Sequence, residues 1–194
     1  WSGARSVRGR WVLEKATRAV GMGAGAVYIF NDPYDGGTHL SDFKLVRPFF
    51  RDGSVFCYLA SVGHWHDVGG NVPGNYNPVA TECFQEGMLI PPVKLFVKGE
   101  IRQDIIDILL ANSRLPNSLY GDLYGQINAL DLGARRMTAL LDEYGDNTVA
   151  EALVELRVRA AKLMAANIAD LPDGTYSAQD FLDNDGIVDE PLII

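Results

Sequence analysis

Short apolar runs separated by turn-forming residues fill the first half of the chain. Runs at 27–30, 43–50 and 54–62 have the length and apolar content typical of β-strands. Asp52-Gly53 separates the second run from the third, and this dipeptide favours a two-residue hairpin turn. We therefore predict that the second and third runs pair as a β-hairpin.

The hydrophobic pattern changes after a further predicted strand at 93–97. Apolar residues then recur at helical spacing, which predicts helices over 102–110, 117–143 and 148–168. A Pro-Asp-Gly turn follows the last of these segments, and a strand is expected to resume at 175–182. Helices therefore dominate the second half of the chain.

The order of these elements predicts an α+β fold, because strands and helices are not regularly interleaved. We expect a mixed sheet with Gly-rich loops in the first half, helices in the second half and a strand at the C-terminal end. A short helix is also expected at 10–20. We interpret residues 1–194 as an incomplete part of one domain, with strands and loops over 27–100, helices over 101–170 and returning strands over 171–194.

Charge and cysteine content narrow the class of protein. The chain carries 17 Lys and Arg against 25 Asp and Glu, for a formal net charge of −8. This balance argues against nucleic-acid binding, which needs clustered cations, and against a polybasic membrane patch. No apolar run approaches the roughly 18 residues of a membrane-spanning helix. Cys57 and Cys83 have apolar neighbours and are interpreted as buried thiols of a reducing compartment.

Histidine and aspartate gather in the Gly-rich half of the chain. The three histidines, His39, His64 and His66, all fall in turn-rich segments or at strand ends. Four aspartates lie in the same segments: Asp32, Asp35, Asp42 and Asp67. Imidazole and carboxylate groups are ligands of Zn²⁺, Mn²⁺ and Fe²⁺.

The predicted hairpin indicates which of these side chains meet. His39 and Asp42 are three residues apart, so both can reach one point from a single turn. Folding 54–63 back along 43–50 returns the chain at His64 to the neighbourhood of Asp42. We therefore predict a divalent metal site formed by His39, Asp42 and His64, with open positions for water or substrate.

The two residues after this set have candidate roles in proton transfer. His66 shares a face with His64 if the strand continues, and it can then relay a proton. Asp67 is the natural carboxylate to orient an imidazole. The alternative is that these loop histidines only bond to turns and that the aspartates are ordinary turn residues. Spacing alone leaves both interpretations open.

Two further side chains, Arg114 and Trp65, each have two possible roles. Arg114 is expected to form a salt bridge, with Asp122 as a candidate partner, or to bind a substrate carboxylate. Trp65 lies between two histidines, where it either walls a pocket or packs in the core.

Several motifs resemble one protein family. The run from Asn31 to Asp42, NDPYDGGTHLSD, closely resembles the signature of the hydantoinase B/oxoprolinase family, as does GHWHDVGG from Gly63 to Gly70. Further stretches match in the family's order: Pro73-Gly74, Gln85-Glu86-Gly87 through Leu95, Gly121-Asp122-Leu123, and Leu171 to Tyr176.

The resemblance implies a cytoplasmic protein that works with a hydantoinase A-like ATPase, which binds ATP with Mg²⁺. Carboxylase members of the family hold a divalent metal with a His, an Asp three residues on and a second His some 25 residues after the first. Carried over, this pattern falls on His39, Asp42 and His64, since 64 − 39 = 25. Two departures stand out: Ser41 occupies a position where the family commonly has Pro, and family members are far longer.

The resemblance leaves more than one reaction open. The leading hypothesis is the B component of an ATP-dependent cyclic-amide hydrolase, in which the partner activates the carbonyl and a metal-activated water opens the ring. His66 or Asp67 would then take or relay the proton. The alternatives are an ATP-dependent ketone carboxylase subunit and a purely structural interface segment of such a complex.

Overall fold

A computed structural model of the protein describes residues 23–35, 37–182 and 192–193. The chain divides into two compact units, Trp1–Leu140 and Leu141–Ile194. The helix expected at 10–20 lies outside the described residues.

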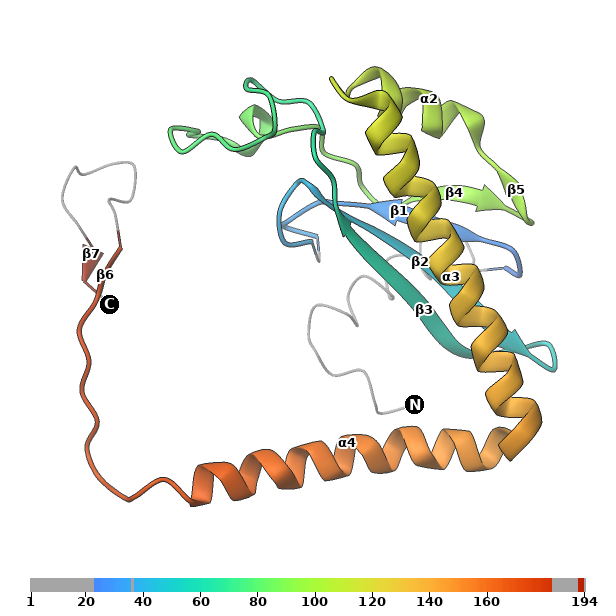
Figure 1. The fold of residues 1–194 in the computed structure, drawn as a ribbon, viewed down its shortest axis with the longest axis vertical. Coiled ribbons are helices and arrows are strands. Elements are labelled where there is room, and N and C mark those ends of the chain that lie inside the picture. Colours follow the sequence, from blue (N-terminus) through green and yellow to red (C-terminus); the bar gives the residue numbers. More distant parts are fainter. Residues whose placement is uncertain (1–22, 36, 183–191, 194) are drawn as a thin grey trace. The chain divides into compact units, whose positions relative to one another are not determined.

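The first unit contains a five-stranded sheet with the strand order β3-β2-β1-β4-β5 (Figure 1). Its strands are β1 (Val27–Phe30), β2 (Asp42–Arg51), β3 (Ser54–His64), β4 (Val93–Val97) and β5 (Glu100–Ile101). Each neighbouring pair is antiparallel. The predicted α+β class is thus confirmed, with strands first and helices after them.

The predicted hairpin is present as β2 and β3, which pair along their whole length from Asp42↔His64 to Arg51↔Ser54. Asp52 and Gly53 join the strands with φ of 49° and 77°. Two successive positive φ values are typical of the turn whose twist matches that of antiparallel strands.

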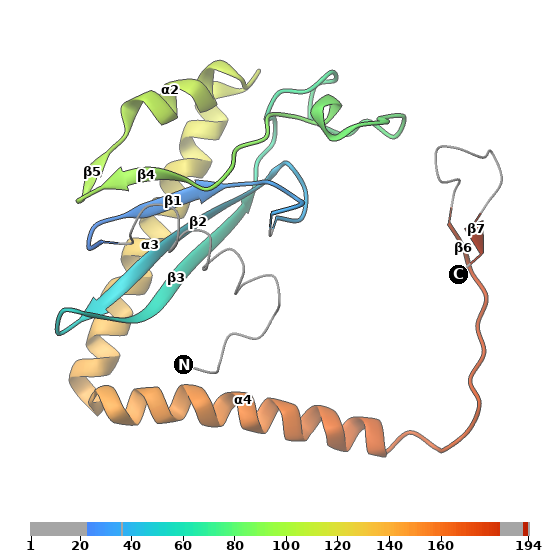
Figure 2. The same cartoon turned by 180° about the vertical axis from the view of Figure 1, so that it is seen from behind.

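Two helices cover one face of this sheet, α2 (Gln103–Ala111) and α3 (Pro116–Tyr144). Helix α3 crosses that face over β1, β2 and β3, and Figures 1 and 2 show this crossing in two opposite views. A short 3₁₀ turn, η1 (Cys83–Gln85), lies in the long segment between β3 and β4. The helices predicted over 102–110 and 117–143 are therefore confirmed, with small shifts at their ends.

The core forms between these helices and alternate residues of the strands. Side chains from β1, β2 and β4 enter it, namely Val27, Ile29, Phe43, Leu45 and Leu95. The helices contribute Ile106, Leu109, Leu119, Leu123 and Leu130. This period of two in the strands leaves the intervening residues, Asp42 and Lys44 among them, for the opposite face of the sheet.

Trp65 packs in this core, which is one of the two roles that its sequence position left open. Its ring is 1% exposed and stacks on Phe43 with centroids 3.9 Å apart. The indole Nε1 donates to Gln126 Oε1 at 2.8 Å, and Gln126 Nε2 donates to the Phe43 main-chain oxygen at 3.0 Å. Gln126 on α3 therefore ties the first residue after β3 to the start of β2, which is where the candidate site lies.

The second unit contains α4 (Asp146–Ala169) and two short paired strands, β6 (Phe181–Leu182) and β7 (Leu192–Ile193). The strand expected over 175–182 is thus reduced to its last two residues. Several large apolar side chains of α4 are exposed: Leu153, Val154, Leu156, Val158, Leu163, Met164 and Ile168. Within the described part of the chain, no helix is both long and apolar enough to cross a membrane.

Replacing Gln126 by Ala should destabilise the protein by about 2–4 kcal/mol, because two buried polar groups lose their partner and a cavity opens. Urea denaturation of the variant measures this change. The matched control is Asn128→Ala at an exposed position of α3, for which we expect a change within about 0.5 kcal/mol. Equal stability of the two variants would contradict the role proposed for the hydrogen bonds of Gln126 with Trp65 and Phe43.

Candidate metal centre

The hairpin register brings the predicted ligand residues together at one end of the sheet. Asp42 is the first residue of β2 and His64 the last of β3, and the two are directly paired. Paired residues of antiparallel strands project from the same face, so their side chains are neighbours. The predicted proximity of Asp42 and His64 is therefore confirmed.

The Asp42 carboxylate lies between two imidazoles. Its Oδ2 is 2.7 Å from His39 Nδ1, and its Oδ1 is 2.7 Å from His64 Nδ1. The two rings are 6.2 Å apart at an interplanar angle of 78°. The three side chains offer one ligand atom each, and these atoms lie within 4.8 Å of one another.

His39 reaches this point through a tight turn between β1 and β2. The main-chain N–H of Asp42 donates to the His39 oxygen at 3.0 Å, and the His39 N–H donates back to Asp42 Oδ2 at 3.1 Å. Leu40 and Ser41, between them, are buried. The turn is therefore anchored in the fold while the imidazole of His39 faces outward.

Asn31 holds the loop that carries His39. Its side chain is fully buried and follows β1 directly. Nδ2 donates to the main-chain oxygens of Leu40 at 2.6 Å and Met88 at 2.8 Å, while Oδ1 accepts from the Ile90 N–H at 2.7 Å. One amide thus joins two loops that are distant in the sequence. The sequence motif contained Asn31, but nothing local indicated these partners.

Solvent access differs across the three side chains. The imidazoles of His39 and His64 are 69% and 68% exposed, whereas the Asp42 side chain is 14% exposed. A carboxylate at the base with two open imidazoles above it can bind a cation from solvent. Ligand atoms about 2.0–2.2 Å from one tetrahedral Zn²⁺ are about 3.3–3.6 Å apart. The atoms of this set lie within 4.8 Å of one another, so small side-chain rotations bring them onto one ion.

The two histidines also affect the charge state of Asp42. Burial raises the pKa of this carboxyl, but the bonds from His64 and His39 lower it more in sum, so the pKa lies below its ordinary value. Asp42 is therefore ionised at neutral pH, as a metal ligand must be. For Lys44, burial lowers the pKa of the ammonium and the Asp42 charge partly offsets this.

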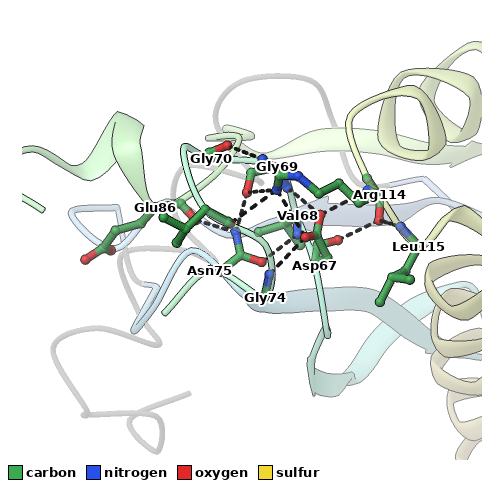
Figure 3. Close-up of polar contacts among 11 residues, drawn as sticks. Asp67, Val68, Gly69, Gly70, Gly74, Asn75, Glu86, Arg114 and Leu115 are labelled. Atoms are coloured by element: carbon green, nitrogen blue, oxygen red, sulfur yellow. Dashed lines mark hydrogen bonds and ion pairs between the residues drawn. The ribbon is translucent and has the colours of Figure 1, made fainter. Parts of the chain in front are cut away.

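Asp67 lies outside this set and is engaged in holding the loop after β3 (Figure 3). The carboxylate is buried, with Oδ1 accepting from the main-chain N–H groups of Gly69 at 3.1 Å and Arg114 at 3.0 Å. Oδ2 accepts from the Gly74 N–H at 3.0 Å and from Arg114 Nη1 at 3.1 Å. Both oxygens are thus satisfied by the loop and by Arg114, which lies two residues before α3.

These bonds set the proton affinity of Asp67. Burial raises its pKa, but the bonds from the main chain of Arg114, Gly74 and Gly69 and from the Arg114 side chain outweigh burial and lower the pKa to about 2. Such a carboxylate is a weak base at neutral pH.

Arg114 completes the loop. Its guanidinium donates to the main-chain oxygens of Gly69, Gly70 and Val72, in addition to Asp67. Asn75 adds bonds from Nδ2 to Gly69 and Glu86, and its Oδ1 accepts from the Val68 N–H (Figure 3). The salt bridge expected for Arg114 is therefore present, with Asp67 as the partner in place of Asp122.

His66 is the remaining predicted site residue. The strand ends at His64, and Trp65 turns inward, so His66 lies beyond the strand with its side chain exposed. Its role in proton transfer stays a prediction.

The comparisons with known proteins agree on one family. The family model for hydantoinase B/oxoprolinase matches residues 2–193. The caprolactamase subunit beta of Pseudomonas jessenii is 40% identical over 162 residues, which is 84% of this chain and 28% of that protein. The acetophenone carboxylase delta subunit of Aromatoleum aromaticum is 27% identical over 165 residues, 84% of this chain and 24% of that protein.

A solved structure shows the same fold. The crystal structure of the ATP-dependent caprolactamase from Pseudomonas jessenii superposes with a TM-score of 0.78 at 37% identity. The match covers 89% of this chain and 31% of that chain. The chain thus spans about a third or less of the length of these relatives.

The low pKa of Asp67 predicts how stability depends on pH. Ionised Asp67 stabilises the folded protein above the unfolded-state pKa of about 3.9, and this contribution is lost as the pH falls from about 4 to about 2. Asp67→Asn should therefore lower the free energy of unfolding by about 2–4 kcal/mol at pH 7. The free energy of unfolding of this variant should also fall less than that of the wild type between about pH 4 and about pH 2.

Chemical denaturation between pH 2 and pH 7 tests this expectation. Asp122→Asn, an exposed carboxyl on α3, is the control and should leave the pH dependence unchanged. If Asp67→Asn follows the wild-type curve across this range, the assigned ion pair does not stabilise the loop.

Proposed function

The chain belongs to the hydantoinase B/oxoprolinase family, and we propose that it supplies the metal-binding half of an ATP-dependent reaction that opens a cyclic amide. The single observation that carries this proposal is the Asp42 carboxylate held between the exposed imidazoles of His39 and His64. The similarity to the caprolactamase subunit beta and to the ATP-dependent caprolactamase of Pseudomonas jessenii adds support.

His39, Asp42 and His64 are the proposed ligands of a divalent metal, with Zn²⁺, Mn²⁺ and Fe²⁺ as the candidates. When bound, such a cation lowers the pKa of a coordinated water and polarises a carbonyl. The chain's own contribution is to keep Asp42 ionised and both imidazoles open to solvent at the end of a rigid hairpin.

Proton transfer is assigned to His66 in preference to Asp67. An imidazole has one nitrogen that can accept a proton and one that can donate it, so it can take a proton from one group and pass it to another. The exposed ring of His66 lies two residues after a proposed ligand. Asp67, with a pKa of about 2 and four donors on its oxygens, is better suited to holding the loop on which His66 lies.

The energy source is proposed to lie on a partner. A hydantoinase A-like ATPase with Mg²⁺ and ATP would transfer a phosphoryl group to the amide oxygen. That transfer forms ADP. Water then attacks the amide carbon, and the C–N bond breaks as nitrogen takes up a proton, which leaves an acyl phosphate. A second water hydrolyses the acyl phosphate to the carboxylate and phosphate. A relative named as a beta subunit supports a hetero-oligomer of this kind, which we place in the cytoplasm.

A ketone carboxylase is the second candidate function, because the acetophenone carboxylase delta subunit also aligns with 84% of this chain. Incorporation of labelled bicarbonate into a ketone substrate separates this reaction from ring opening. The exposed apolar side chains of α4 favour a third role, in which this segment serves chiefly as an interface.

Metal binding tests the proposed ligand set. Wild-type protein should bind about one equivalent of Zn²⁺ or Mn²⁺ in a calorimetric titration, and His39→Ala and His64→Ala should each weaken binding at least about 10-fold. His66→Ala is the matched control, since it removes a neighbouring imidazole outside the set. Equal binding by all four proteins would remove the basis of the proposal.

Nucleotide dependence tests the reaction. The family-length subunit that contains this sequence, combined with its ATPase partner, should open a lactam or hydantoin ring only when ATP is present. His66→Ala should lower kcat by about 10²–10⁴-fold while metal content is retained. Ring opening without ATP would reject the ATP-dependent version.

A further inference from the structure

Lys44 lies beside the proposed ligands on the same face of the sheet. It follows Asp42 by two residues on β2, and residues at this spacing project from the same side of a strand. Phe43 and Leu45, which flank it, point into the core on the opposite side. Lys44 Nζ is 3.4 Å from the main-chain oxygen of Asp42, so the ammonium extends back toward the proposed metal site.

The charge of Lys44 is available to a ligand. Among the described residues, its ammonium has no carboxylate within salt-bridge distance, and its contact with the Asp42 oxygen is long for a hydrogen bond. Two other cations of the first unit are already paired, Arg114 with Asp67 and Arg47 with Asp131. A half-buried ammonium without such a partner binds anions more strongly than one in open solvent.

Ligands can approach Lys44 from the β3 side. Its direct partner on that strand is Val62, which is 60% exposed, and the next residue on the same face is His64. Its partner on β1, Phe30, is 1% exposed. An anion that enters over Val62 would thus meet the ammonium and the open imidazoles from one direction.

The charge of the assembled site favours a dianion. With neutral imidazoles, a divalent cation, the Asp42 carboxylate and the Lys44 ammonium together carry two positive charges. A phosphoryl group on an activated carbonyl oxygen carries about two negative charges at neutral pH. A carboxylate product carries only one.

We propose that Lys44 binds the phosphoryl group of the ATP-activated substrate, beside the ligands His39, Asp42 and His64. This inference rests on the proposed function and deepens it, because it assigns a residue to the group that the partner would transfer. Lys44 acts here as a point charge that holds the phosphoryl oxygens while the neighbouring carbon reacts.

Calorimetric titration of metal-loaded protein tests the proposal with three probes: phenyl phosphate, inorganic phosphate and benzoate. Phenyl phosphate represents a phosphoryl group carried on a substrate, inorganic phosphate the released product, and benzoate a carboxylate. We expect Lys44→Gln to weaken phenyl phosphate binding at least about 10-fold, because a hydrogen bond to a charged group is lost. Lys44→Arg should retain most of the affinity, and wild-type protein should prefer phenyl phosphate to benzoate.

The controls separate this inference from the proposed function. Lys98→Gln, on the exposed β4–β5 turn, should bind all probes as wild type does, and metal affinity should stay within about twofold in every variant. Unchanged phenyl phosphate binding by Lys44→Gln, a loss confined to inorganic phosphate, or a preference for benzoate overturns the role of Lys44 alone. A wild-type protein that binds no metal overturns the proposed function together with this inference.

Discussion

The register of the β2–β3 hairpin is the constraint on which the candidate centre depends. Asp42 and His64 are 22 positions apart in the sequence, and only their pairing at the open end of the hairpin makes them neighbours. A slip of one residue would move one of them to the opposite face of the sheet. Burial of Phe43 and Leu45 under α3 resists such a slip, so core packing and site geometry are coupled.

Two buried polar groups then hold the loops on either side of the hairpin. Asn31 ties the loop before β2 to the segment before β4, and Asp67 ties the loop after β3 to Arg114, two residues before α3. Each oxygen of Asp67 and the amide of Asn31 have good partners, which keeps the cost of burial low. The exposed imidazoles of His39 and His64 therefore project from rigid supports although they lie in loops or at a strand end.

Local patterns were sufficient to predict the hairpin, the two helices of the first unit and the meeting of His39, Asp42 and His64. The dipeptide Asp52-Gly53 and the three-residue spacing from His39 to Asp42 act over short distances, which a sequence reveals. Long-range polar contacts were not predictable in this way. The bond from Arg114 to Asp67 spans 47 residues, and neither residue carries a local sign of the other. The role of Gln126 under Trp65 was missed for the same reason.

The central claim is that two imidazoles and one carboxylate bind a single cation. X-ray absorption spectroscopy of the Zn²⁺-loaded protein tests it most directly, because imidazole rings produce a characteristic outer-shell scattering pattern. The account predicts two imidazole nitrogens and at least one oxygen at about 2.0–2.2 Å from the metal. A shell of oxygen atoms without imidazole scattering would contradict it.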